Sequence, residues 1–387
     1  MAKTIIATRH EIYPSTSLPN SVFAPRIFPL TGGLCQKQIP NVHIKTRYLP
    51  DSNRCQQQHG SNKWILAPHG AGLFKEKFGI LVPTAAGSIF IPSYRNADFK
   101  KTAHITQSAE GLGYHSAWIS DHLMPYSIFD PWTAISGLAV LTSQITLGTL
   151  VSCNLFRHPS IVAKMSTTID HMSGGRFVLG LGAGWLEAEF RGYGIPFPKY
   201  SERLGRLSEA SKLIRRMWLD EKATFEGTYY QVKEAVCNPK AIQKPTLPLW
   251  IGGRGEKLLR IVAAEADGYN LNEGTIDEFK VRLPKLRQLC KEMKREYDSI
   301  EKSWLGTVLI GENSDQVRSK LKKYQPTAIS AERYLGPAVM GTPNECIRKI
   351  EQYKELGVTH FIGWFPEIAE DESGLKLFAR EVMPSFN

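Results

Sequence analysis

The stretch GGRFVLGLGAGWLEAEF, residues 174–190, decides the fold assignment. An apolar run at 177–179 continues into glycines at 180, 182 and 184, and a helix-like segment follows. This order predicts a β-strand whose carboxyl end is nearly bare of side chains. Glycines there allow a flat ligand to approach the backbone closely, although a plain strand-to-helix turn gives the same pattern.

The stretch does not match the dinucleotide-binding motif G-x-G-x-x-G. Trp185 occupies the position of the third glycine, and Glu187 and Glu189 come far too early to bind a ribose. The strand is also the fourth expected in its domain, whereas the motif follows the first strand. We therefore interpret it as a barrel strand, whose carboxyl end lies on the active-site face.

The rest of residues 77–387 alternates short apolar runs with amphipathic patterns. Strands are expected at 77–82, 116–120, 145–151, 176–182, 247–252, 267–271, 303–310 and 360–365, and helices at 97–112, 202–218, 255–266, 344–356 and 375–382. Eight strands, most of them followed by a helix, predict a (β/α)8 TIM barrel with insertions, and an open doubly wound sheet is the alternative. Insertions are expected at 219–246, where FEGTYYQV indicates a strand or hairpin over the barrel mouth, and at 311–343.

Residues 1–76 differ from the rest in composition. They are rich in Pro, Ser, Asn and Gln and lack periodicity, so we expect a disordered or loosely packed extension before the barrel domain. Their basic, acid-poor composition leaves a transit peptide and a misassigned start codon open as interpretations.

The charge of the chain argues for a small-molecule partner. The formal net charge is +11, but residues 1–76 hold nine of the 48 basic residues and only three of the 37 acidic ones, which leaves 39 and 34 for the remainder. We therefore expect no nucleic-acid binding. No apolar run reaches the roughly 18 residues of a membrane span. The six cysteines are too scattered for a disulfide framework or a zinc site, and we expect a reducing cytoplasm and no metal.

Two further strand ends carry polar groups. Asp121 and His122 follow the second expected strand, where His122 is placed for proton transfer or a hydrogen bond to a ligand. The sequence Gly252-Gly253-Arg254-Gly255 joins a strand to a helix, and a helix amino terminus there favours a phosphate. Structural roles, a capped turn and a tight βα connection, remain the alternatives.

Together these places resemble the bacterial luciferase-like flavin and deazaflavin oxidoreductases. The matching stretches are KFGILVP (77–83), AWISDHLMP (117–125), residues 145–197, residues 248–270 and GVTHFIGWFP (357–366). The resemblance implies a TIM barrel that binds coenzyme F420, a 5-deazaflavin, or FMN at its mouth. The F420-dependent branch is the most similar, which implies hydride transfer to or from a small organic substrate, and an FMN-dependent monooxygenase is the alternative. It also implies a homodimer.

The resemblance assigns roles to individual residues. The catalytic pair implied is Asp121 and His122. A bulge with a non-prolyl cis peptide under the cofactor ring is implied at Val151, Ser152 and Cys153, and Cys153 departs from the small hydroxyl or proline expected there. The other implied cofactor-binding residues are Gly182, Ala183, Gly184, Glu187, Gly252, Gly253 and Arg254. Trp185 and Trp364 are expected to line the substrate pocket. A metal-dependent barrel hydrolase and a non-catalytic barrel remain alternatives.

Overall fold

The computed structural model describes residues 76–84, 98–124, 129–326 and 330–386. The extension expected over residues 1–76 therefore lies outside the described residues, except for Glu76. The carboxylate of Glu76 pairs with the Lys354 ammonium at 2.8 Å. All other described residues fall within 77–387, the range expected for the barrel domain.

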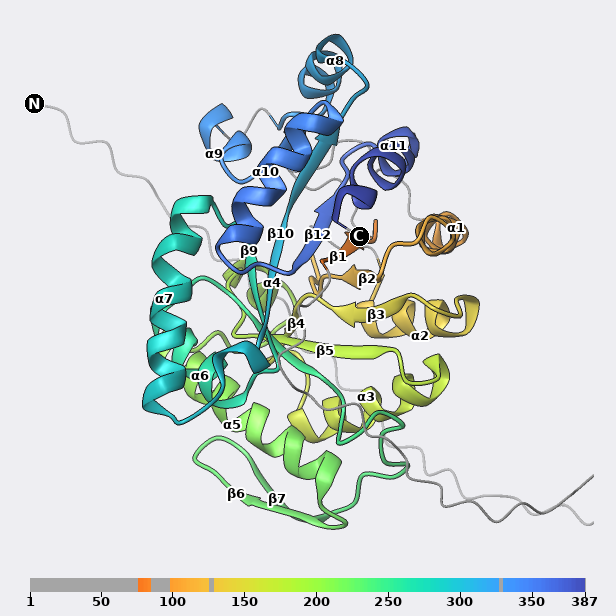
Figure 1. Cartoon of the computed structure of the whole chain (residues 1–387). Coiled ribbons are helices and arrows are strands. Elements are labelled where there is room, and N and C mark those ends of the chain that lie inside the picture. The colour runs from red at the N-terminus through yellow and green to blue at the C-terminus, as the bar shows by residue number, and fades with distance from the viewer. Residues whose placement is uncertain (1–75, 85–97, 125–128, 327–329, 387) are drawn as a thin grey trace, which may run out of the picture. The chain divides into compact units, whose positions relative to one another are not determined.

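Eight parallel strands close into a barrel (Figure 1). In spatial order they are β1 (Lys77–Leu81), β2 (Ser116–Ile119), β3 (Thr146–Thr149), β5 (Phe177–Gly182), β8 (Leu249–Gly252), β9 (Gly268–Asn272), β10 (Glu301–Ile310) and β12 (His360–Trp364). Pairing of β9 with β10 and of β12 with β1 completes the ring. Each strand overlaps one of the expected ranges, so the TIM barrel is confirmed and the open sheet is excluded.

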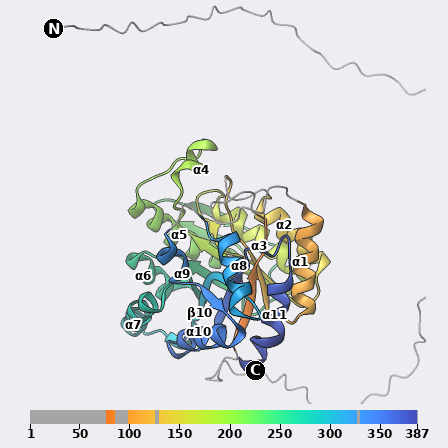
Figure 2. The same cartoon turned by 90° about the horizontal axis from the view of Figure 1, so that it is seen from above.

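Helices surround the strands, as Figures 1 and 2 show. They are α1 (Phe99–Gly111), α2 (Pro131–Leu141), α3 (Pro159–Ser173), α4 (Glu187–Gly192), α5 (Tyr200–Leu219), α6 (Glu256–Glu265), α7 (Ile276–Glu292), α8 (Ser314–Tyr324), α9 (Ala331–Leu335), α10 (Pro343–Glu355) and α11 (Ser373–Glu381). Short 3-10 turns occupy Tyr297–Ser299 and Met383–Phe386. Local sequence explains the ends of α3, which starts with a proline after the His158 cap and stops at Gly174 in a left-handed conformation.

Tryptophan side chains fill the middle of the barrel. The rings of Trp118 and Trp250 lie 4.7 Å apart between centroids, and neighbouring strands carry glycines where the rings lie. A Cβ at Gly148 would come within 2.3 Å of Trp118, and one at Gly268 within 2.4 Å of Trp250. The interior at this level is a packed core.

A hydrogen-bonded polar cluster lies at the amino ends of the strands. Ser116, Glu301 and His360 begin β2, β10 and β12. The His360 ring contacts Ser116 Oγ through Nε2 at 2.7 Å and Glu301 Oε1 through Nδ1 at 3.0 Å. Lys77 pairs with the same carboxylate at 3.0 Å. Since Ser116 and His360 are buried, side chains occupy this end of the barrel.

The two expected insertions have different positions. Residues 219–246 contain the antiparallel hairpin β6 (Ala223–Glu226) and β7 (Gln231–Ala235), so an inserted hairpin is confirmed. No residue of this insertion, which lies within the described ranges, lines the cavity at the barrel mouth, so its expected place over the mouth is wrong. Its turn at Thr228 and Tyr229 donates hydrogen bonds to Glu209 of α5. This insertion follows a helix and precedes a strand, and such connections enter a barrel from its amino end. Residues 311–343 follow β10 and hold α8, α9 and β11 (Val339–Gly341).

Candidate active site

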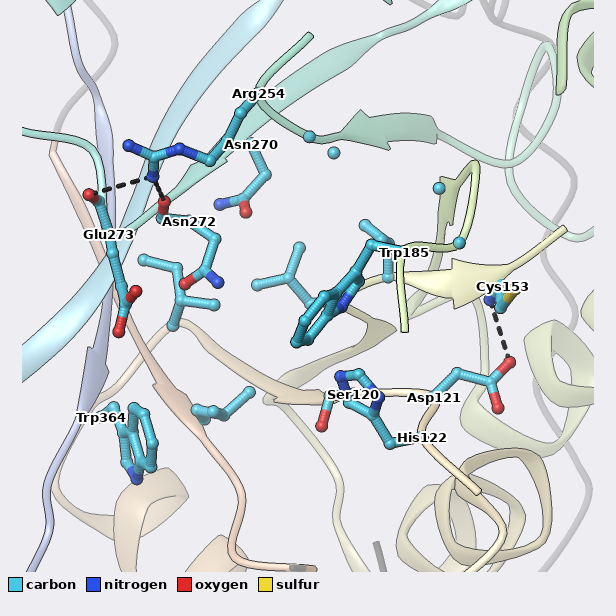
Figure 3. A pocket seen from close by; sticks show the side chains of 18 of the residues that line it. Ser120, Asp121, His122, Cys153, Trp185, Arg254, Asn270, Asn272, Glu273 and Trp364 are labelled. Carbon is cyan, nitrogen blue, oxygen red and sulfur yellow. Dashed lines mark hydrogen bonds between the residues drawn. The ribbon is translucent and has the colours of Figure 1, made fainter. Parts of the chain in front are cut away.

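A cavity of about 990 Å³ opens at the carboxyl ends of the strands (Figure 3). This volume is at the upper end of the roughly 300–1,000 Å³ that small-molecule sites occupy. Ten of the twelve expected site residues line it: Asp121, His122, Val151, Cys153, Gly182, Ala183, Gly184, Gly252, Gly253 and Arg254. Residues from four expected strand ends therefore meet in one hollow.

A β-bulge follows β3. The five steps from Leu147 to Ser152 lie opposite the four steps from Phe177 to Leu181, because β3 and β4 (Ser152–Cys153) pair with β5 in registers that differ by one residue. A cis peptide bond joins Leu150 to Val151. The bulge implied by the resemblance is present at its expected place.

The bulge directs the Val151 side chain over three glycines. A Cβ would lie 3.2 Å from a Val151 methyl group at Gly180, 2.5 Å at Gly182 and 2.7 Å at Gly252. Side chains at Gly182 and Gly252 would therefore collide with Val151, which forms part of the cavity wall. Packing therefore explains the glycines at 182 and 252: any larger residue there would collide with the Val151 side chain.

The Asp121 carboxylate is held through one oxygen only. Its Oδ2 accepts from Ser152 Oγ at 2.7 Å, from the Cys153 N–H at 3.1 Å and from Arg157 at 2.6 Å. Its Oδ1 is buried and has no hydrogen-bond partner among the described residues. Burial raises the pKa of Asp121, and the charge of Arg157 opposes that rise. A buried acceptor without a partner is costly.

His122 contacts a second buried acid. Its Nδ1 lies 2.6 Å from Oε1 of Glu189, and the Glu189 side chain is 3% exposed. The Trp185 ring meets the His122 ring edge to face, with centroids 5.9 Å apart. Figure 3 shows the His122 and Trp185 rings close together at the cavity wall.

The turn before α6 lies at the other side of the cavity. Gly253 has a φ of +146°, which favours glycine. Arg254 donates to the carbonyls of Asn272 at 2.5 Å and Glu273 at 3.2 Å, and it pairs with Glu278. Gly255 precedes the helix without a side-chain cap, so the amino terminus of α6 offers backbone donors and a positive dipole.

Two expected residues do not line the cavity. Ser152 reaches it only through its hydrogen bond to Asp121. Glu187 is 58% exposed in its side chain and pairs with Arg191 along α4. Cys153 lines the cavity, but burial raises the pKa of its thiol to about 12, so the sulfur stays protonated at neutral pH.

Sequence reasoning missed Glu189 and Glu273. Glu273 directly follows β9, has a left-handed backbone with φ of +48°, and lines the cavity. Burial raises the pKa of its carboxyl, and the charges of Arg254 and Arg333 oppose the rise. Figure 3 shows Glu273 and Trp364 across the cavity from Asp121. Polar residues at the end of an expected strand, the signal that identified Asp121, also mark Glu273.

The second insertion closes over this part of the cavity. It contributes residues from α9 and its flanking turns: Ser330, Glu332, Arg333, Gly336 and Pro337. Among the described residues, no group of three or more His, Cys, Asp or Glu side chains is arranged to bind a metal ion. Within the same ranges, no helix has both the length and the apolarity of a membrane span.

Known proteins are similar to this chain in sequence and in fold. The F420-dependent glucose-6-phosphate dehydrogenase of Microbacterium testaceum is 29% identical over 309 residues, 71% of this chain and 90% of that protein. The 5,10-methylenetetrahydromethanopterin reductase of Methanopyrus kandleri is 27% identical over 334 residues, 74% of this chain and 95% of that protein. The fold is also that of an F420-dependent secondary alcohol dehydrogenase solved with an F420–acetone adduct, with a TM-score of 0.69, 22% identity, and coverage of 81% of this chain and 99% of that one.

A family profile matches most of the barrel. Residues 77–333 match the family described as luciferase-like monooxygenase, and this range is more than half of the chain. The match includes seven of the eight barrel strands, from β1 to β10, and the residues of the cavity as far as Arg333. The chain therefore belongs to the luciferase-like monooxygenase family and is an oxidoreductase of that family.

Proposed function

We propose that this protein binds coenzyme F420 in the cavity and transfers a hydride between that cofactor and a small organic substrate. The observation that carries the proposal is the convergence of Asp121, His122, Val151, Gly182 and Gly253 on one hollow. The relative from Microbacterium testaceum, which aligns with 71% of this chain, is named as an F420-dependent enzyme, and this supports F420 as the cofactor.

The residues present suit a planar ring with an anionic end. Asp121 Oδ1, buried and without a partner among the described residues, suits an N–H or O–H donor of the ligand. Val151 offers an apolar surface for one face of the ring. The uncapped amino terminus of α6 suits a phosphate, and Arg254 holds the turn in place through its bonds to Asn272 and Glu273.

Bound F420 supplies hydride donor and acceptor chemistry at its ring, and the chain supplies position, proton handling and exclusion of water. His122 is the group we assign to hold or accept a proton at a substrate oxygen. Trp185 and Trp364 line the cavity on either side of the space left for substrate. Cys153 takes no part as a nucleophile, because its pKa of about 12 keeps it protonated.

Titration of the purified full chain with F420 and, separately, with FMN tests the proposal. We expect saturable quenching of F420 fluorescence and weak or absent FMN binding. The Asp121→Asn variant is expected to weaken F420 binding about tenfold or more, since a hydrogen bond to a charged group contributes about 1.5–3 kcal/mol. Tight FMN binding without F420 binding would reverse the cofactor assignment.

An FMN-dependent monooxygenase is the second candidate, and the description of the matching family supports it. Oxygen uptake separates the two, because reduced FMN reacts with oxygen and a deazaflavin reacts poorly. We also propose a homodimer in a reducing cytoplasm, to be tested by light scattering. Free thiols at all four cysteines of the described ranges support that compartment.

A further inference from the structure

The contact between His122 and Glu189 joins two elements that are distant in sequence. His122 follows β2, and Glu189 lies in α4, 67 residues later. The donor–acceptor distance is 2.6 Å, which is a close hydrogen-bond contact. Glu189 is 2% exposed, so this carboxylate is positioned by the fold rather than by solvent.

The chemistry of the pair fixes the proton on the imidazole. An ionised carboxylate only accepts hydrogen bonds, so a bond from His122 to the carboxylate form of Glu189 requires a proton on Nδ1. When His122 is neutral, its lone pair is then on Nε2. Glu189 therefore determines which tautomer the neutral His122 ring presents.

The neighbours of α4 keep Glu189 in place. Phe190, the next residue, packs against Gly184 so closely that a Cβ there would lie 2.9 Å from its ring. The Phe190 ring also packs within 4.8 Å of Phe197 and 5.0 Å of Phe156 between centroids. These contacts anchor the buried face of α4, while Glu187 lies on the exposed face and pairs with Arg191.

We infer that Glu189 is the positioning residue of the active site: it orients the His122 ring and holds its neutral form in the Nδ1–H tautomer. The inference rests on the proposed role of His122 in proton transfer. Glu189 itself lines the cavity, and in this assignment it acts through His122. The acid–base group of the reaction is thus His122, positioned by Glu189, while Asp121 binds the ligand.

Kinetics of Glu189→Gln test the inference first. Glutamine has the same shape but its amide can donate to Nδ1 and stabilise the other tautomer. We expect kcat to fall about 100-fold, within the usual contribution of general acid–base catalysis, with KM and F420 affinity unchanged. Arg191→Gln, on the same helix and 81% exposed in its side chain, is the control and should keep kcat within about twofold.

A double-variant cycle distinguishes positioning from a general loss of structure. If Glu189 acts through His122, Glu189→Gln lowers kcat in the wild type but not in the His122→Ala background. An equal loss in both backgrounds overturns the inference. Glu189→Asp, which keeps the charge with one methylene fewer, should retain more activity than Glu189→Gln, and equal activity of the two also counts against it.

A spectroscopic readout does not depend on the cofactor. In protein labelled with 15N at histidine, the His122 signals, identified by their absence in His122→Ala, should report a protonated Nδ1 and an unprotonated Nε2 when the ring is neutral. Glu189→Gln should change that pattern, and Arg191→Gln should not. A wild-type ring protonated only on Nε2 overturns the inference. Failure of F420 to bind, with the expected tautomer present, instead contradicts the proposed function and leaves the positioning role intact.

Discussion

The contact between Val151 and Gly182 gives the sharpest test of how the cavity wall is built. In Gly182→Ala the new methyl group would lie 2.5 Å from Val151 Cγ2, whereas ordinary contacts of this kind are 3.4–4 Å. Val151 must then move by about 1 Å. Overpacking of this kind costs about 1–3 kcal/mol in the free energy of unfolding. Replacing a strand glycine by alanine otherwise gains about 0.5–1 kcal/mol, which leaves a net loss of up to about 2.5 kcal/mol.

Removing the valine methyl groups should reverse the effect of Gly182→Ala on the free energy of unfolding. In the Val151→Ala background the clash with Cγ2 is absent, so Gly182→Ala should be neutral or stabilising by up to about 1 kcal/mol. The coupling between the two positions is then about 1–3 kcal/mol. Urea unfolding of the wild type, the two single variants and the double variant, followed by circular dichroism, measures this coupling. Gly111→Ala is the control, because nothing lies within 4 Å of a Cβ there.

The same variant affects ligand binding. A displaced Val151 enters the cavity, so F420 affinity should fall in Gly182→Ala and recover in the double variant. An equal change in stability from Gly182→Ala in both backgrounds would refute the packing argument.

Two further predictions concern titration and thiol chemistry. At the amino end of the barrel, burial alone would raise the pKa of Glu301, but His360 and Lys77 outweigh it and lower the pKa from 4.5 to about 2. Its contribution to stability is therefore present above about pH 4.5 and lost as the pH falls towards 2, and Glu301→Gln should flatten the urea stability profile across that window. The Cys153 thiol, with a pKa of about 12, should resist iodoacetamide at pH 8 in the folded protein and react after unfolding, as peptide mass spectrometry would show.

Strand positions could be predicted from the sequence because a short apolar run marks each barrel strand. The stretch at 177–182 is an example, since it is buried throughout in the structure. The place of the insertion at 219–246 could also have been predicted. It connects α5 to β8, and the rule that βα connections form the mouth assigns it elsewhere.

Side-chain direction was harder to predict. Glu187 and Glu189 both follow the glycine run, and two steps along a helix rotate a side chain by about 200°. The sequence alone does not give the phase of a helix as short as α4, and the resemblance assigns the cofactor role to Glu187 although Glu189 is the buried acid. The sequence also does not show that Val151 packs against Gly182 and Gly252, because this contact depends on how the bulge turns the Val151 side chain.

The proposed function requires that one cavity at the carboxyl ends of the strands binds a redox-active ring. A crystal structure of the protein co-crystallised with F420 tests this requirement directly. We expect density for the ring between Val151 and Trp185, a ligand donor at Asp121 Oδ1 and an anionic group at the start of α6. Ordered F420 at any other surface, with this cavity filled by water alone, would show that the cavity is not the cofactor site.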